Sequence, residues 1–423
     1  MIPETERSAA FKYFEMLQNS GYESNFEEFL FSIEQIYGIS NMYIIDDVEM
    51  LRRFKTSEIL LGYGFTKDKN IDISLITKSL KIISNLCESD ECCKYFVSIG
   101  VMDLIHNNLF SDLTNKKVIL NIFRISINIA SSGYHELVLE KITIGKVIQV
   151  LTIYYQYGKI YSLIGQLVFL LSFVSTQETF QMFLKIIDFS LAKVNIFSNY
   201  WVFCTVVNLI KSPETARKFI SSNEFVNFLN EAFQQEEIEI WEPAIRIVHA
   251  LYYYIDDLIE GFDYSCFIKM IQIDEETIVE LALRTIANIM TSDDMTELMI
   301  NLNIVPLLTI TNDKTYSVNC SFLNALTNAI QTCYQSEIYI FINNHSIRSL
   351  INGLEYEKKK LCLKIMKSIN RIFEIEPDNE IVQKDFYDCF DEQIFDNILN
   401  SSCKELSDYS HYLSKTYPNY FNL

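Results

Sequence analysis

Polar residues recur at one regular place inside otherwise apolar segments of this sequence. The clearest cases are LALRTIANIM, with Asn288, and FLNALTNAI, with Asn328. A carboxamide donates and accepts hydrogen bonds, so it can hold a peptide group of another chain without reading its side chain. The chemistry this pattern predicts is therefore binding. Aligning the segments gives eight positions, 36 to 44 residues apart: Asn85, Asn128, Ser172, Asn208, His249, Asn288, Asn328 and Asn370.

Two interpretations of these eight aligned positions are open. A buried amide without a partner costs about 1–3 kcal/mol, so each amide must be used. In the first, the amides bind the backbone of an extended peptide: packed helices lie about 8–10 Å apart, and an extended chain advances about 3.3 Å per residue. One amide per repeat would then meet about every third peptide residue. Alternatively, each amide bonds the backbone of the adjacent repeat, as a structural ladder.

The mean interval of about 41 residues predicts a repeat array, because armadillo and HEAT units have this length. A second landmark lies fifteen residues after several aligned positions, at Gly100, Asn223, Asn303 and Asn343. Gly and Asn enter the left-handed backbone region most easily, so these residues predict helix-ending turns. Each repeat is expected to contain a long helix with the aligned residue, a turn and a short helix. Such repeats stack because none can bury its apolar face alone.

Composition agrees with an all-α solenoid. The 423 residues are 49% hydrophobic, with only 11 Gly and 6 Pro to break long apolar segments. We predict a right-handed α-solenoid of about eight to nine armadillo-type repeats. Residues 1–45 are expected to form an N-terminal helical cap, and residues 46–423 the solenoid with a C-terminal capping half-repeat.

The net charge of −20 disfavours nucleic-acid binding, which needs a basic patch to neutralise phosphates. The acidity either attracts basic partners or keeps a hydrophobic chain soluble. Ten scattered Cys without a CxxC pair indicate buried apolar residues in a reducing compartment, and no apolar run is long enough to span a membrane. We expect a monomer in the cytoplasm, the nucleus or both.

The pattern of a small or apolar residue, three variable residues, an aliphatic residue, a small residue and Asn resembles the armadillo repeat. LALRTIANIM with NIVPLL, and FLNALTNAI with NNHSIRSLI, carry the resemblance, which covers residues 45 to 423. Asn in repeat after repeat is most similar to the importin-α family of nuclear-import adaptors. That resemblance implies that the aligned amides line a concave surface and clamp an extended basic peptide.

The sequence departs from the importin-α pattern four residues before each aligned position, where that family places Trp. These sites hold Lys81, Arg124, Val168, Cys204, Ile245, Arg284, Asn324 and Met366. Lys81, Arg124 and Arg284 would repel a basic peptide locally and favour an acidic or neutral segment. Residues 1–40 contain only Arg7 and Lys12 as basic residues, so they do not match the family's Arg-rich N-terminal arm.

No catalytic, phosphate-binding or metal-binding motif occurs, so we predict neither an enzyme nor a cofactor. His249 is expected to act as a binding or ladder residue. Carboxylates at helix ends, such as Asp293 and Asp294, either cap helices or form an acidic rim. We predict a non-enzymatic importin-α-like adaptor for an extended protein segment. The alternative is a general armadillo scaffold without a transport role.

Overall fold

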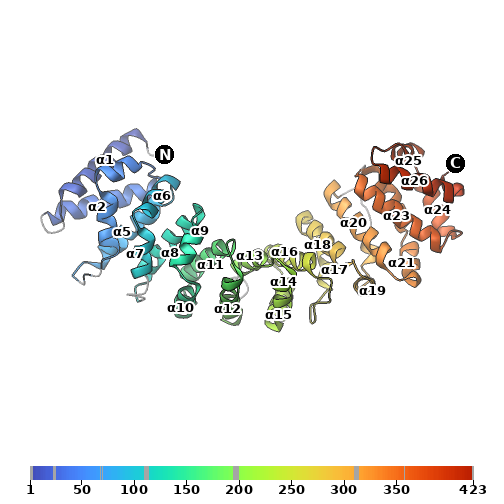
Figure 1. The fold of residues 1–423 in the computed structure, drawn as a ribbon, viewed down its shortest axis with the longest axis horizontal. Helices are drawn as coiled ribbons and strands as arrows, with labels where there is room; N and C mark the ends of the chain where they lie inside the picture. Colours follow the sequence, from blue (N-terminus) through green and yellow to red (C-terminus); the bar gives the residue numbers. More distant parts are fainter. Residues whose placement is uncertain are drawn as a thin grey trace. The chain divides into compact units, whose positions relative to one another are not determined.

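The computed structural model describes residues 3–21, 25–66, 68, 70–108, 114–193, 200–308, 314–356 and 358–421. These residues form helices and turns, with no strand among them, so the all-helical prediction is confirmed. The chain divides into two compact units, residues 1–209 and 210–423, which we call the N-terminal and C-terminal units. Figure 1 follows the helices of each in chain order. The predicted division at residue 45 stays a prediction.

The described helices of the N-terminal unit are 6 to 17 residues long. Its helices are α1 (Glu4–Asn19), α2 (Phe26–Met42), α3 (Val48–Arg53), α4 (Thr56–Gly64), α5 (Ile73–Leu86), α6 (Asp90–Ser98), α7 (Val101–Asn108), α8 (Lys116–Ser131), α9 (His135–Lys141), α10 (Ile144–Tyr154), α11 (Gly158–Ser172), α12 (Gln177–Lys193) and α13 (Tyr200–Leu209).

The long helices of the N-terminal unit pack in series. Helix α2 contacts α5, α5 contacts α8, α8 contacts α11, and α11 contacts α13. Fully buried Ile83, Ile125, Leu167 and Val206 come from four of these helices. Burying one such side chain contributes about 1.5–3 kcal/mol. The unit is therefore held together by contacts between neighbouring repeats.

The C-terminal unit is also built from helices joined by turns. Its elements are α14 (Pro213–Ile220), α15 (Asn223–Gln234), α16 (Ile238–Tyr254), α17 (Cys266–Ile271), α18 (Glu276–Ile289), α19 (Asp293–Asn301), the 3₁₀ helix η2 (Val305–Leu307), α20 (Tyr316–Thr332), η3 (Gln335–Glu337), α21 (Ile338–Asn343), α22 (Ser346–Asn352), η4 (Gly353–Tyr356), α23 (Lys359–Ile375), α24 (Glu380–Cys389), α25 (Glu392–Leu399), α26 (Lys404–Thr416) and α27 (Pro418–Phe421). Its series of packed long helices is α16, α18, α20, α23 and α26.

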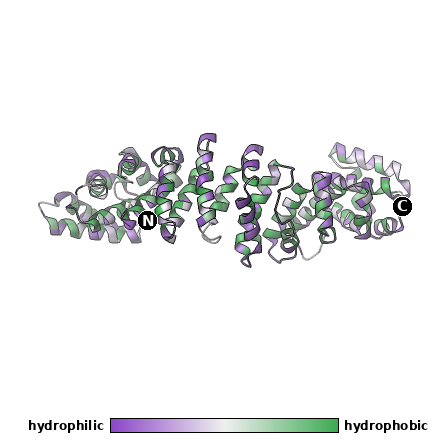
Figure 2. Ribbon diagram, turned by 90° about the horizontal axis from the view of Figure 1, so that it is seen from below, coloured by the Kyte–Doolittle hydropathy of each residue, from purple (hydrophilic) through white to green (hydrophobic). Residues whose placement is uncertain are grey.

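Each long helix is amphipathic, and Figure 2 shows hydrophobic and hydrophilic residues alternating around the helices. The apolar faces form the cores of both units. All ten Cys are free thiols, and seven of them are buried, which agrees with their predicted role as small apolar residues. No helix in the described part of the chain is long and apolar enough to cross a membrane.

Two of the four predicted turn residues adopt the left-handed backbone conformation. Gly100 and Asn303 do adopt positive φ, at 87° and 59°. Asn223 does not, because it begins α15 behind Ser222, whose side chain accepts a hydrogen bond from the Phe225 N–H. Asn343 ends α21, as a helix-ending turn requires, but the left-handed residue is His345, two positions later, with φ of 56°.

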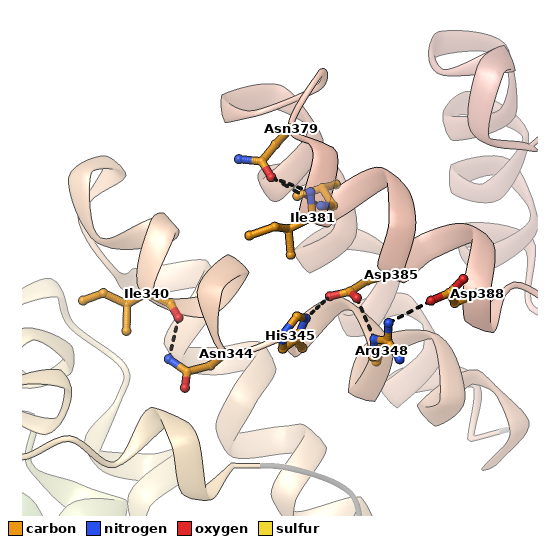
Figure 3. A network of polar contacts seen from close by, with 9 residues as sticks. Ile340, Asn344, His345, Arg348, Asn379, Ile381, Asp385 and Asp388 are labelled. Atoms are coloured by element: carbon orange, nitrogen blue, oxygen red, sulfur yellow. Dashed lines mark hydrogen bonds and ion pairs between the residues drawn. The ribbon is translucent and has the colours of Figure 1, made fainter.

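His345 belongs to a polar network that joins α22 to α24 (Figure 3). The carboxylate of Asp385, only 1% exposed, lies 2.8 Å from His345 Nδ1 and accepts a hydrogen bond of 2.6 Å from Arg348 Nε. Arg348 also donates to Asp388 at 2.8 Å. The network satisfies a carboxylate that would otherwise be costly to bury.

Close packing of α11 against α13 depends on Gly165. A Cβ added there would lie 2.7 Å from Trp201 Nε1 and closer still to other indole atoms. We expect Gly165→Ala to lower the free energy of unfolding by about 1–3 kcal/mol, as overpacking does. Urea denaturation of the full chain, followed by circular dichroism, measures the change.

Gly38→Ala is the matched control, because Gly38 lies inside α2 with nothing within 4 Å of an added Cβ. Replacing an unhindered helical Gly by Ala stabilises a helix by about 0.5–1 kcal/mol. Equal effects of the two substitutions would contradict the packing seen at Gly165.

Candidate functional site

The eight aligned positions lie near the carboxyl ends of consecutive long helices. Asn85, Asn128, Ser172 and Asn208 lie on α5, α8, α11 and α13 of the N-terminal unit. His249, Asn288, Asn328 and Asn370 lie on α16, α18, α20 and α23 of the C-terminal unit. Residues four and seven positions earlier lie on the same helix face, so each aligned residue shares its face with the preceding turns.

In the N-terminal unit, the amides bond the preceding repeat. Asn128 Nδ2 donates to the carbonyl of Ser84 at 2.9 Å, and Asn208 Nδ2 donates to Ser172 Oγ at 2.9 Å. Ser172 is fully buried and donates to the carbonyl of Phe169. These contacts form part of the structural ladder that the sequence left open.

Asn85 extends this pattern to α2. Its Nδ2 donates to Asn41 Oδ1 at 3.0 Å and approaches Ser40 Oγ at 3.2 Å. Asn41 precedes Asn85 by 44 residues, which matches the repeat spacing. The polar end of α2 is therefore in phase with the following repeats.

In the C-terminal unit, Asn328 is bonded on both sides. Its Nδ2 donates to the carbonyl of Ala287 at 2.7 Å, and its Oδ1 accepts from Lys364 Nζ at 3.1 Å. Asn370 is 8% exposed and donates to Glu374 on its own helix, at 2.7 Å. Asn370 therefore makes no ladder bond like that of Asn328.

At the fifth aligned position, the imidazole of His249 contacts the next repeat. Its Nδ1 lies 3.4 Å from Thr285 Oγ1, at the limit of a hydrogen bond. Burial lowers the pKa of His249, and the cations of Arg284 and Arg246 lower it further. The ring is therefore favoured in its neutral form.

Asn288 differs from the other aligned residues. It is half-buried, and its side-chain amide has no hydrogen-bond partner among the described residues. It lines a hollow of about 400 Å³ together with Tyr253, Asp256 and Thr291. Tyr253 is 72% exposed, far more than an aromatic ring in a core. At this position the amide is free to bond a ligand.

Four polar residues one turn before the aligned positions are also predicted to contact a bound peptide, and they have different surroundings: Lys81, Arg124, Arg284 and Asn324. Arg284 pairs with Glu280 on its own helix. Asn324 donates to the carbonyl of Cys320 at 3.0 Å, and Lys364 approaches its Oδ1 at 3.4 Å. Lys81 and Arg124 are half-buried, and no carboxylate lies within ion-pair distance of either in the described part of the chain.

Lys81 and Arg124 line one cleft of about 730 Å³ between α5 and α8. Lys78, Lys116 and Lys117 also line it, and we call this the basic cleft. Burial lowers the pKa of Lys81, and Arg124 lowers it further while Glu88 opposes the shift. The repeat pattern in the sequence predicts Lys81 and Arg124 as binding residues, but it does not indicate that Lys78, Lys116 and Lys117 lie beside them.

Asn121 is another residue that the sequence analysis missed. It lies two helical turns before Asn128, lines the basic cleft and donates to the carbonyl of Thr77 at 3.0 Å. The segment KKVILNIFRISINIA does contain this second Asn seven residues before the first. A search for amides at that spacing would have found it.

The aligned amides therefore stabilise the fold, and some of their hydrogen-bonding groups remain without a partner among the described residues. Each carboxamide has two N–H groups and an oxygen with two lone pairs. The ladder uses an Nδ2 group in Asn85, Asn128 and Asn208, and no described residue donates to their Oδ1 atoms. A peptide backbone could use these oxygens. Among the described residues, no group of three or more His, Cys, Asp or Glu side chains could hold a metal ion.

Comparison with known proteins gives a fold likeness alone. No protein-family model matches the sequence, and neither does any curated protein sequence. The crystal structure of an engineered protein matches with a TM-score of 0.76 at 13% identity, covering 97% of this chain and 98% of that one. A chain from a study of the phosphorylation switch that controls the interaction between cadherin and β-catenin matches with a TM-score of 0.70 at 12% identity, covering 98% and 84%.

A designed armadillo-repeat protein covers 55% of this chain and 98% of its own, at 14% identity and a TM-score of 0.48. The predicted all-α solenoid is confirmed.

The hydrogen bonds predict which aligned residues stabilise the fold. We expect Asn128→Ala and Asn328→Ala each to lower the free energy of unfolding by about 1 kcal/mol, because each loses a bond to the preceding repeat. Asn288→Ala should change it by less than about 0.5 kcal/mol, since no such bond exists. Urea denaturation measures the free energy of unfolding of the three variants. All three replace Asn by Ala within a helix, so the gain in helix propensity is the same and the differences report the lost hydrogen bonds. Equal losses at all three sites would contradict this assignment.

The surroundings of His249 predict its titration. We expect Arg284→Gln to raise the pKa of His249, because it removes a cation that lowers this pKa. NMR titration measures this, with His249→Gln assigning the signal among five histidines.

The lowered pKa also links folding to pH. Below the ordinary value of 6.5, the unfolded chain binds more protons than the folded one. The contribution of His249 to stability is therefore present above pH 6.5 and is lost as the pH falls towards the folded-state pKa. For the Arg284→Gln variant, an unchanged or lower pKa of His249 would show that the Arg284 cation does not act on the His249 ring.

Proposed function

We propose that this chain is a non-enzymatic protein-binding scaffold that holds an extended segment of a partner along the helix faces carrying the aligned amides. The observation that carries the proposal is the free amide of Asn288 in its hollow. An amide without an internal partner, beside an exposed Tyr, can bond a peptide group and pack against its side chain.

Two further observations support the proposal. The Oδ1 atoms of Asn85, Asn128 and Asn208 accept no bond from the described residues, so the same backbone-binding chemistry recurs in the N-terminal unit. One structural neighbour comes from a study of an interaction between two proteins, cadherin and β-catenin. Armadillo-type solenoids present long surfaces built from successive repeats, which suits an extended segment.

A narrower candidate is an importin-α-like adaptor for nuclear import, acting in the cytoplasm and nucleus. The recurrence of Asn at the aligned positions favours it. Lys81, Arg124 and Arg284 stand where that family's pattern has Trp, and they disfavour a Lys/Arg-rich ligand by like-charge repulsion. The general scaffold is therefore the better-supported function, and the import adaptor is tested beside it.

A peptide selection tests the scaffold proposal. We expect a library of displayed random 12-residue peptides to yield ligands of the purified full-length chain. Asn288→Ala should weaken the binding of the ligands by about two- to tenfold, the effect of losing a hydrogen bond. Fluorescence anisotropy measures the affinities.

Asn301→Ala is the matched control, because Asn301 is an exposed amide at the end of α19. It should leave the affinities unchanged. Failure to enrich any peptide, or equal binding by wild type and Asn288→Ala, would contradict the proposal.

A Lys/Arg-rich import-signal peptide tests the narrower candidate in the same assay. Salt-sensitive binding that is lost in the Asn288→Ala/Asn328→Ala double variant would support an import adaptor. Absence of binding by the folded wild type would exclude this ligand class and leave the general scaffold.

A further inference from the structure

The basic cleft has a charge opposite to that of the molecule. The chain carries 55 acidic and 35 basic residues. The lining of the cleft nevertheless contains five basic residues, Lys78, Lys81, Lys116, Lys117 and Arg124, and no Asp or Glu. Chance placement on an acidic surface would mix the signs, so a cleft of one sign is an unusual local arrangement for this chain.

Few carboxylates in the described part of the chain neutralise these cations. Lys78 pairs with Glu34 of α2, and Lys116 lies 3.3 Å from the centre of the Tyr157 ring. No described carboxylate lies within ion-pair distance of Lys81, Lys117 or Arg124. Two half-buried cations, Lys81 and Arg124, repel each other across the cleft, and an anion between them would remove that repulsion.

The backbone adds to the positive potential. The first residues of α5 and α8 line the cleft, as Ile73 and Ser74 on one side and Lys116 and Lys117 on the other. The N-terminal end of a helix carries a partial positive charge. The caps Asp72 and Asn115 accept hydrogen bonds from some of these N–H groups, and the negative charge of Asp72 offsets the partial charge of α5, so the side-chain cations are the main source of positive potential.

The cleft also adjoins the aligned amides. Lys81 and Arg124 lie four residues before Asn85 and Asn128, on the same faces of α5 and α8. A peptide that crosses both helices could place acidic side chains in the cleft while its backbone meets the free Oδ1 atoms. A long nucleic acid fits less well, because it would also meet the acidic remainder of the surface.

We propose that the basic cleft is a docking site for an Asp/Glu-rich segment of a partner protein, with Lys81 and Arg124 as its central anion-binding residues. This inference rests on the proposed scaffold function and adds the chemical class of the ligand. Arg124 offers a planar fork of donors that matches a carboxylate, and Lys81 and Lys117 add point charges. Attraction of this kind raises both affinity and the rate of association.

The test uses the full-length chain and three fluorescein-labelled 12-residue peptides in which Ser alternates with Glu, Gln or Lys. We expect the Glu peptide to bind at low salt and the Gln and Lys peptides to bind at least about tenfold more weakly. Raising the salt to about 0.3 M should weaken binding of the Glu peptide several-fold, because it screens exposed charges.

The variant Lys81→Gln/Arg124→Gln should bind the Glu peptide about tenfold more weakly than wild type. Lys12→Gln/Lys185→Gln makes the same change in net charge at two exposed residues of the same unit, and we expect less than a twofold effect. Lys117→Gln, at an exposed residue, gives a second test that does not depend on the half-buried pair.

Equal binding of the Glu and Gln peptides, or equal loss in the cleft and control variants, would overturn the inference. So would tighter binding of an oligothymidylate with the same number of charges, which would assign the cleft to nucleic acid. If library-derived neutral peptides still bind and respond to Asn288→Ala, the scaffold function stands while the acidic-ligand inference fails. Tighter binding of a peptide with phosphoserine in place of Glu, still lost in the cleft variant, would support the anion site and refine its ligand.

Discussion

The fold depends on contact between each long helix and its counterpart about 41 residues away. No repeat buries its apolar face alone, so residues such as Ile83, Ile125 and Leu167 become core only when their helices stack. The amide bonds follow the same geometry, because Asn128 and Asn328 donate to carbonyls 44 and 41 residues earlier. Apolar packing supplies most of the stability, and these bonds fix the register of neighbouring helices.

The same constraint leaves part of each long helix outside the core. One stripe of each long helix faces its neighbours, and the rest is free of packing demands. Residues there can vary between repeats without loss of the core. Asn328 is tied on both sides by Ala287 and Lys364, whereas Asn288 is free beside Tyr253. Repeats that are alike in architecture can therefore differ in what they offer a partner.

The sequence predicted the helices, their repeat and two of four turn residues, because apolar period and Gly or Asn at a positive φ are local signals. Asn223 and Asn343 do not adopt the left-handed conformation. In the first case Ser222 supplies a helix cap, and in the second His345 takes the left-handed conformation beside buried Asp385. Helix capping and tertiary ion pairs compete with the intrinsic preference of Asn, and the repeat pattern alone does not rank them. The role of each amide was equally undetermined, since a ladder and a ligand use the same donor.

The basic cleft shows what a linear sequence conceals about charge. Lys78 and Lys81 lie on one helix and Lys116, Lys117 and Arg124 on the next, separated by about one repeat. In the sequence, these five residues look like ordinary polar residues of two amphipathic helices. The net charge of −20 gives no indication that they gather in one place. Stacking of α5 on α8 adds their potentials in one place, because charges that are distant in sequence lie within a Debye length of about 8–10 Å across packed helices. A solenoid therefore sets its local electrostatics by the register of its repeats, and the sign of the whole chain does not predict the sign of a particular surface.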